Sequence, residues 1–338
     1  MPHTTASLNS IIHGDAKTAL ARIPDECVNC CITSPPYWGL RDYEVNGQIG
    51  RENSPEMYIN ALLDVFSEVD RVLKPDGTCF VNMGDTYAGG GGGTARNTDT
   101  GQYLKRSKYS YILPNGAAKS VMYRGTDRQK SLLMIPYRFA WQMVEKSGWK
   151  LRNIINWHKP NQMPCSAKDR FTVDFEPVFF FSKNTQYYFE QQFEPYSTPF
   201  NRWGGVNLDT AQSKSAWSEQ TGQNLYRNRN MRPNPKGRNM RTTWSINTKG
   251  FKGNHFAVYP EKLVERMILA GCPAGGTVLD PFAGSGTTCI VAQKTGRNFI
   301  GVELNPEYIE ITKDRLGSVK NYSLNTVQTP FKCKANVK

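Results

Sequence analysis

The sequence predicts an α/β protein built on a doubly wound, mostly parallel sheet. Short apolar runs with the length of buried strands alternate with longer segments in which apolar residues recur at helical spacing. Turn residues separate the two kinds of segment. Strands joined by helices of this length form parallel sheets, which bind their ligands beyond the carboxyl ends of the strands.

The predicted elements fall into three runs along the chain. Lys74-Pro75-Asp76-Gly77 should end a helix in the first run, because proline and glycine interrupt helices. Lys159-Pro160-Asn161 should form a turn in the second run. In order, we expect a strand ending at His13, a helix after Gly14-Asp15, a strand over Val28–Thr33, a helix over Ile59–Leu73 and a strand over Thr78–Met83; then a helix over Leu132–Ser147, a strand entering the Lys159 turn and a strand within Phe175–Lys183; and finally a helix over Pro260–Ala270, a strand over Gly276–Leu279, a helix over Thr287–Thr295, a strand over Asn298–Val302 and a helix over Pro306–Leu316.

Two polar segments carry the excess positive charge. Residues 86–130, which include a glycine-rich run, hold 8 Lys and Arg against 2 Asp and Glu, and residues 196–252 hold 10 against 2. The net charge of the whole chain is +13, so the remainder is nearly balanced. Aromatic residues are interleaved with the basic ones, which favours nucleic-acid binding over a merely solvated surface.

Composition excludes several classes of protein. The 338 residues suffice for one large domain with a sizeable insertion. No window approaches 18 consecutive apolar residues, and no basic stretch followed by an apolar run opens the chain, so we expect no membrane contact and a cytoplasmic location. The eight cysteines lack framework spacings and should be reduced core thiols. Cys27, Cys30 and Cys31 have no second ligand pair for zinc, so no metal site is predicted.

A glycine-containing loop follows an apolar strand near the C-terminus. Asp280 ends the strand, and Gly284 and Gly286 precede a helix, which lets a ligand approach backbone amides. The loop lacks the Gly-Lys pair of a phosphate-binding loop, and Cys289 stands where a dinucleotide fingerprint has its third glycine. Glu303, at the end of the next strand, can accept both hydroxyls of a ribose. A nucleoside without a pyrophosphate fits best; nicotinamide binding and two plain surface acids are the alternatives.

Five sequence motifs in a fixed order resemble the β group of the DNA amino-methyltransferases. "TSPPY", from Thr33 to Tyr37, looks like the catalytic [Ser/Asn/Asp]-Pro-Pro-[Tyr/Phe/Trp] motif, and "DPFAGSGTT", from Asp280 to Thr288, looks like the S-adenosylmethionine loop. "HGDAKTAL", "NWHKPN" and "HFAVYPEKLVERMI" resemble three further motifs. The resemblance runs from His13 to Leu316 outside the two basic segments. It implies the class I S-adenosylmethionine-dependent methyltransferase fold in circularly permuted motif order.

The resemblance also implies a division of the chain and a set of site residues. The division is a catalytic half at 1–195 with the insertion 86–130, a target-recognition region at 196–252, a cofactor-binding half at 253–320 and a tail at 321–338. The implied catalytic residues are Ser34, Pro35, Pro36 and Tyr37. The implied cofactor is S-adenosyl-L-methionine, held by Thr33, Asp280, Phe282, Gly284 and Gly286, with Glu303 at the ribose, Asp15 at the adenine and Pro260–Lys262 closing the methionine end. The expected DNA-binding residues are Trp38, Lys159, Arg227, Arg229, Arg232, Arg238 and Arg241.

The catalytic motif suits methyl transfer to an amino group of a base, a poor nucleophile whose lone pair is delocalised into the ring. Ser34 Oγ and the Pro35 carbonyl can engage the amino hydrogens, and the prolines direct these acceptors. The base must leave the duplex at a cost of a few kcal/mol, and stacking on Tyr37 or Trp38, at about 1–3 kcal/mol per base, offsets much of it. We therefore expect direct, in-line transfer to a flipped base of double-stranded DNA.

The sequence leaves several alternatives for the target and the partners. In the family, serine at the first motif position is associated mainly with N4-cytosine enzymes and aspartate or asparagine mainly with N6-adenine enzymes, so N4-cytosine is favoured and N6-adenine is the alternative. A catalytically inactive DNA-binding protein and a methyltransferase acting on RNA or a protein amide also remain. A covalent route through Cys165 is disfavoured, because Ser34–Tyr37 already occupies the catalytic position. A second copy of the chain and a cognate restriction endonuclease are the further expected partners.

Overall fold

The computed structural model describes residues 7–40, 43, 45–88, 130–196, 234, 236–248 and 259–318. Its helices are α1 (Ala16–Leu20), α2 (Pro55–Val72), α3 (Ile135–Glu145), α6 (Glu261–Gly271), α7 (Thr287–Lys294) and α8 (Pro306–Gly317). Its strands are β1 (Ser10–His13), β2 (Val28–Thr33), β3 (Leu73–Asn82), β4 (Lys150–His158), β5 (Phe175–Ser182), β6 (Phe193–Glu194), β7 (Arg238–Asn239), β8 (Thr243–Ser245), β9 (Thr277–Asp280) and β10 (Asn298–Glu303).

Within these ranges an eight-stranded sheet has the order β1-β10-β9-β2-β3-β5-β4-β8. All neighbouring strands from β1 to β3 in this order are parallel. The strand β5 runs antiparallel to both of its neighbours, and β8 is parallel to β4. The predicted mostly parallel α/β sheet is therefore confirmed.

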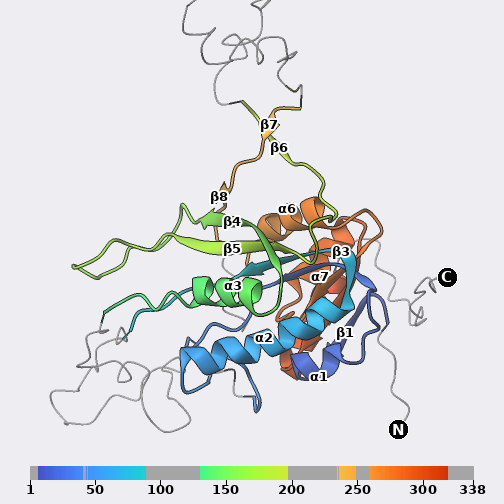
Figure 1. Cartoon of the computed structure of the whole chain (residues 1–338), viewed down its shortest axis with the longest axis horizontal. Helices are drawn as coiled ribbons and strands as arrows, with labels where there is room; N and C mark the ends of the chain where they lie inside the picture. Colours follow the sequence, from blue (N-terminus) through green and yellow to red (C-terminus); the bar gives the residue numbers. More distant parts are fainter. Residues whose placement is uncertain are drawn as a thin grey trace, which may run out of the picture. The chain divides into compact units, whose positions relative to one another are not determined.

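Helices cover both faces of this sheet (Figure 1). Cys31, Cys79 and Phe179 share one apolar cluster with residues of α1, α2 and α3. Successive side chains of a strand point to opposite faces, and a Cβ built on Gly271 of α6 would meet Phe80 at 2.6 Å, which places α6 on the other face. The sheet is therefore doubly wound. None of the described helices has the length and apolarity that a bilayer span requires.

The helix α2 and the strand β3 differ from the prediction at their ends. Ser54 caps α2 by accepting a hydrogen bond from the Met57 amide, with proline at the first helical position, so the helix begins before Ile59. Leu73 is already extended, with φ −72° and ψ 138°, and pairs with Val28 of β2. The predicted turn at residues 74–77 thus lies inside β3, where a register shift in β2 accommodates it.

The chain divides into two compact units, Met1–Glu190 with Thr242–Lys338, and Gln191–Arg241. The first unit holds the eight-stranded sheet, and the described part of the second holds the antiparallel pair β6–β7. In that second unit Arg238 and Arg241 both pair with Glu194, at 2.8 and 2.6 Å. The predicted boundaries at 196 and 252 remain a prediction.

The parallel pairing brings the carboxyl ends of several strands to one edge of the sheet. His13 of β1 lies beside Glu303 of β10, and Gly301 of β10 lies beside Asp280 of β9. The Gly14 amide also donates to the Glu303 carbonyl at 3.0 Å. The loops that follow β1, β9 and β10 therefore meet at one edge, where an open α/β sheet binds its ligands.

Candidate active site

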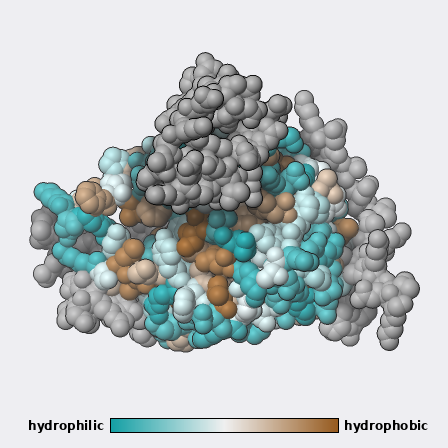
Figure 2. Space-filling model, turned by 45° about the horizontal axis from the view of Figure 1, so that its top comes forward, coloured by the Kyte–Doolittle hydropathy of each residue, from teal (hydrophilic) through white to brown (hydrophobic). Residues whose placement is uncertain are grey.

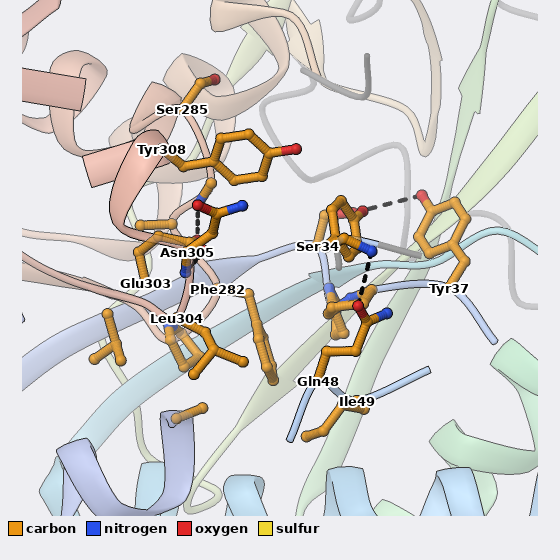
Figure 3. Close-up of a pocket in the computed structure, with 18 of the residues that line it drawn as sticks. Ser34, Tyr37, Gln48, Ile49, Phe282, Ser285, Glu303, Leu304, Asn305 and Tyr308 are labelled. Atoms are coloured by element: carbon orange, nitrogen blue, oxygen red, sulfur yellow. Dashed lines mark hydrogen bonds between the residues drawn. The ribbon is translucent and has the colours of Figure 1, made fainter. Parts of the chain in front are cut away.

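A cavity of about 480 Å³ lies beyond this edge, a volume typical of small-molecule sites. Both the Ser34–Tyr37 motif and the glycine-containing loop line it, although they are far apart in the sequence. Figure 3 shows the side chains of the two halves facing one cavity: Ser34 and Tyr37 on one side, and Glu303, Leu304, Asn305 and Tyr308 on the other, with Phe282 between them.

Glu303 is held by two backbone amides at the cofactor end of the cavity. Its Oε2 accepts from the Gly284 amide at 2.7 Å, and its Oε1 accepts from the Asn305 amide at 2.8 Å. Burial raises the pKa of Glu303, while these two hydrogen bonds oppose that shift. Each carboxylate oxygen retains a further acceptor site, so this side chain is oriented to receive two hydroxyl groups.

A second carboxylate and several apolar side chains complete this end of the cavity. The Asp15 carboxylate caps α1 by accepting from the Thr18 amide at 3.1 Å, and the residue lines the cavity. Ile49, Phe282 and Leu304 supply apolar walls. A carboxylate with spare acceptor sites beside apolar and aromatic walls suits a nucleoside, so the residues present fit S-adenosyl-L-methionine.

Asp280 and Thr33, which we expected at the cofactor site, are not among the residues that line the cavity, and their cofactor role remains a prediction. Asp280 is 1% exposed, and its carboxylate accepts four hydrogen bonds. The donors are Thr33 Oγ1 at 2.6 Å, Thr288 Oγ1 at 2.6 Å, the Phe282 amide at 3.1 Å and the Tyr259 hydroxyl at 3.2 Å. Both oxygens are engaged, so Asp280 holds the loop and the wall residues Phe282 and Tyr259 in place.

Ionisation of Asp280 should destabilise the cofactor-free protein. Burial raises the pKa of Asp280, and hydrogen bonds from Thr288 and Thr33 oppose the shift without cancelling it. Protonated Asp280 therefore stabilises the folded state. This stabilisation is fully present below the unfolded-state pKa of about 3.9, and it is lost as pH rises through the higher folded-state pKa. Urea unfolding across pH should show the wild type losing stability relative to Asp280→Asn as pH rises. A pH-independent difference would contradict this.

Gly286 lets the loop pack against a helix and is not among the residues that line the cavity, so its predicted part in the cofactor site remains a prediction. Its φ is +76°, and a Cβ there would come within 2.2 Å of Thr312 Cγ2 of α8. The neighbouring loop residue Ser285 is bound by Arg315 Nη1 through its carbonyl at 2.5 Å and its hydroxyl at 2.9 Å. Glycine at 286 thus allows the loop to lie against α8, while Gly284 remains at the cavity.

A hydrogen-bond network joins the catalytic motif to an ion pair at the other end of the cavity. The Tyr37 hydroxyl donates to Glu176 Oε2 at 2.8 Å and lies 3.5 Å from Ser34 Oγ. Asn82 Nδ2 also donates to Glu176 Oε2, at 3.2 Å. Lys159 Nζ donates to Glu176 Oε1 at 2.5 Å, and their side chains are only 12% and 19% exposed. Burial, and then the Glu176 carboxylate, raise the pKa of Tyr37 well above its ordinary value.

Sequence reasoning missed Glu176, Asn82 and Tyr259, all of which line the cavity. Asn82 ends β3, so the strand-end rule could have found it. Glu176 lies at the start of β5, and only the antiparallel direction of this strand brings its beginning to the same edge. At the predicted segment Pro260–Lys262, the cavity contact comes from the preceding Tyr259.

The predicted DNA-binding residues lie in different parts of the structure. Trp38 is 2% exposed, and its indole nitrogen donates to the Glu52 carbonyl at 2.8 Å; as a core residue it presents no face to a base, which corrects that prediction. Lys159 faces the cavity in the pair with Glu176 instead of an open surface. Arg238 and Arg241 share Glu194 in the second unit. Arg227, Arg229 and Arg232 lie outside the described residues, as does most of the insertion 86–130.

The fold and the cavity define the class of protein. A doubly wound sheet with a carboxylate-fixed nucleoside site beyond its strand ends, adjoining Ser34-Pro35-Pro36-Tyr37, is the arrangement of a class I S-adenosylmethionine-dependent methyltransferase. The fold is similar to that of PvuII DNA methyltransferase (cytosine-N4-specific), with a TM-score of 0.59 and 20% identity over 95% of this chain and 90% of that one. It is also similar to a putative DNA modification methylase of Thermus thermophilus complexed with S-adenosyl-L-methionine, with a TM-score of 0.53 and 23% identity over 93% and 95% of the two chains.

Sequence comparison gives the family. A model described as DNA methylase matches residues 28–314. The chain is 39% identical over 307 residues to the type II methyltransferase M.Cfr9I of Citrobacter freundii, covering 91% of this chain and 87% of the relative. It is 37% identical over 306 residues to the type II methyltransferase M.SmaI of Serratia marcescens, covering 90% of each. The chain belongs to the DNA methylase family of S-adenosylmethionine-dependent amino-methyltransferases, which confirms the predicted family, enzyme class and cofactor.

Proposed function

We propose that this DNA methyltransferase is sequence-specific and methylates the exocyclic N4 of a cytosine flipped out of double-stranded DNA. The observation that carries the proposal is the single cavity lined both by Ser34, at the first position of the catalytic motif, and by the Glu303 site. The similarity to the type II methyltransferases M.Cfr9I and M.SmaI supports action at a specific DNA site.

The catalytic motif acts by engaging the amino hydrogens of the base. Ser34 Oγ and the Pro35 carbonyl accept these hydrogens, so the nitrogen lone pair localises as charge develops. The Pro36 carbonyl already accepts from Tyr58 at 2.8 Å, which fixes the turn that carries both acceptors. S-adenosyl-L-methionine, when bound beside Glu303 and Phe282, would supply an electrophilic methyl group. The amino nitrogen would attack it directly, so that the N–C bond forms as the methyl–sulfur bond breaks, S-adenosylhomocysteine is released and the nitrogen loses one proton to solvent, with no covalent enzyme intermediate.

Tyr37 provides a fixed wall for the flipped base. Its ring lies against Gly84, where a Cβ would come within 2.4 Å of Cε2, and its hydroxyl is bound to Glu176. The ring is therefore oriented before a base arrives, and stacking on such a ring is worth about 1–3 kcal/mol per base.

One donor at this end of the cavity supports cytosine over adenine. Lys159 lines the cavity, donates to Glu176 Oε1 and, as an ammonium group, keeps further N–H groups and has no acceptor. Both amide hydrogens of Asn82 are engaged, by Glu176 Oε2 and the Pro177 carbonyl. Beside its amino group, cytosine presents two acceptors, N3 and O2, whereas adenine presents N1 and a C–H group, so a Lys159 donor matches cytosine better and N6-adenine is the alternative target.

Two partners belong to the same proposal. A cognate restriction endonuclease that cuts the unmethylated site is supported by the type II relatives, and a second copy of this chain is proposed as a dimer partner. We further propose that the region 196–252 recognises the target sequence. Its arginines, Arg238 and Arg241 among them, supply the cationic side chains that phosphate contacts need.

Incubation with plasmid DNA and S-adenosyl-L-methionine should yield N4-methylcytosine. Mass spectrometry of the digested nucleosides identifies the base, and single-molecule sequencing of the plasmid identifies its sequence context. N6-methyladenine in place of N4-methylcytosine would assign the alternative target. Transfer to RNA or protein but not to DNA, or cofactor binding without any transfer, would overturn the proposal.

A further inference from the structure

The chain between β4 and β5 forms a projecting hairpin connection, residues 160–174, which we call the hairpin arm. It leaves and returns at the catalytic cavity, because Lys159 and Glu176 stand at its two ends and both line that cavity. The Lys159 amide donates to the Asp174 carbonyl at 2.7 Å and closes the base of the arm. Figure 1 shows the arm extending away from the sheet beyond β4 and β5.

The hairpin arm exposes large apolar side chains to an unusual degree. Phe171 is 95% exposed, Met163 is 78% exposed and Val173 is 47% exposed. Figure 2 shows several separate apolar patches among hydrophilic side chains, so exposure alone does not mark a binding surface. The arm differs from those patches in its position, because the residues at its two ends, Lys159 and Glu176, line the cavity in which we propose that the target base binds.

Hydrogen bonds and ring contacts hold the hairpin arm in its conformation. The Cys165 amide donates to Thr172 Oγ1 at 3.2 Å across the tip. The Arg170 guanidinium lies over the Tyr87 ring at 3.8 Å, and Lys130 pairs with Asp169 at 2.8 Å. These contacts tie the arm to Tyr87 and Lys130. Since the arm is already ordered, little entropy is lost when its side chains meet a partner.

A flipped base leaves a gap in the stacked duplex, and proteins that distort DNA often place apolar side chains between base steps. We propose that the hairpin arm is such a wedge, with Phe171 and Met163 filling the gap next to the extruded target base. The wedge rests on the proposed function, because it requires a base that leaves duplex DNA. The expected occupant of this apolar surface is therefore the interior of a DNA duplex, reached at the same site as the cavity.

The double variant Phe171→Ala/Met163→Ala should lose activity on paired DNA and regain it when extrusion is easy. We would compare kcat/KM for tritiated-methyl transfer on two duplexes with the target sequence, one fully paired and one with an abasic site opposite the target base. Loss of the wedge should lower kcat/KM roughly tenfold on the paired duplex, because extrusion costs a few kcal/mol. On the abasic duplex the variant should stay within about twofold of the wild type, because no pairing is broken there.

A matched control removes an exposed aromatic side chain that lies outside the hairpin arm and the cavity. Trp141 of α3 is 66% exposed and does not line the cavity, so Trp141→Ala should behave as the wild type on both duplexes. An equal loss of activity of the hairpin-arm variant on both duplexes, or no loss on either, would overturn the wedge. The proposed function is tested separately, by the identity of the methylated nucleoside that the wild type makes. The ratio of kcat/KM on the paired duplex to kcat/KM on the abasic duplex tests the wedge whichever base is methylated.

Discussion

Ser34→Ala should reduce DNA methylation by about 10²–10³-fold while S-adenosyl-L-methionine still binds. The hydroxyl is one of two acceptors for the amino hydrogens, and its loss removes stabilisation from a transition state in which charge grows on nitrogen. The cofactor end is fixed separately, by the hydrogen bond between Glu303 and the Gly284 amide. The measurement pairs single-turnover methyl transfer with calorimetric titration of the cofactor.

Ser131→Ala is a suitable control for this change, because Ser131 is exposed and its hydroxyl bonds only locally, to the Leu132 carbonyl at 3.3 Å. We expect this control to keep full activity. Turnover by Ser34→Ala close to that of the wild type would exclude the motif as the amino-group binding site.

Breaking the Lys159–Glu176 pair should cost the protein about 3 kcal/mol of unfolding free energy, since removing one partner of a buried pair leaves the other uncompensated. Both side chains are largely buried and 2.5 Å apart. Glu176→Gln and Lys159→Met should also lower methylation, because Glu176 anchors the Tyr37 hydroxyl and Lys159 lines the cavity in which we propose that the base binds. Urea unfolding and methyl transfer, measured on the same samples, separate the two effects.

The double variant Glu176→Gln/Lys159→Met provides the decisive comparison. It removes both charges at once, so it should recover much of the stability lost by either single variant without recovering activity. Lys150→Met, at the opposite end of the same strand, changes an exposed lysine and should be neutral in both assays. Additive stability losses in the double variant would show that the two charges do not act as a pair.

The catalytic motif and the cofactor loop could be identified from short stretches of the sequence. Ser34-Pro35-Pro36-Tyr37 and the loop around Gly284 could be found without a structure, because their functions depend on backbone turns that proline and glycine impose on a few adjacent residues. The strand ends also followed from apolar periodicity. This is why Asp15, Phe282 and Glu303 were predicted at the cavity and are found there.

Side-chain packing across the fold decides what individual residues can do. Trp38 follows the catalytic motif directly, yet packing against the core turns it inward. Asp280 stands where a ligand-binding carboxylate is expected, and its oxygens accept four hydrogen bonds, from Thr33, Tyr259, Phe282 and Thr288. Whether a polar group is free for a ligand depends on its neighbours in space, and a single sequence does not contain that information.

The sequence by itself determined the family, the cofactor and the two halves of the active site, because short motifs encode turns and strand ends. Only the tertiary structure decided which side chains complete the cavity. Glu176 and Lys159 come from β5 and from the end of β4, and they meet because these two strands are antiparallel. The connection between the same two strands forms the hairpin arm, whose Phe171 and Met163 side chains are exposed.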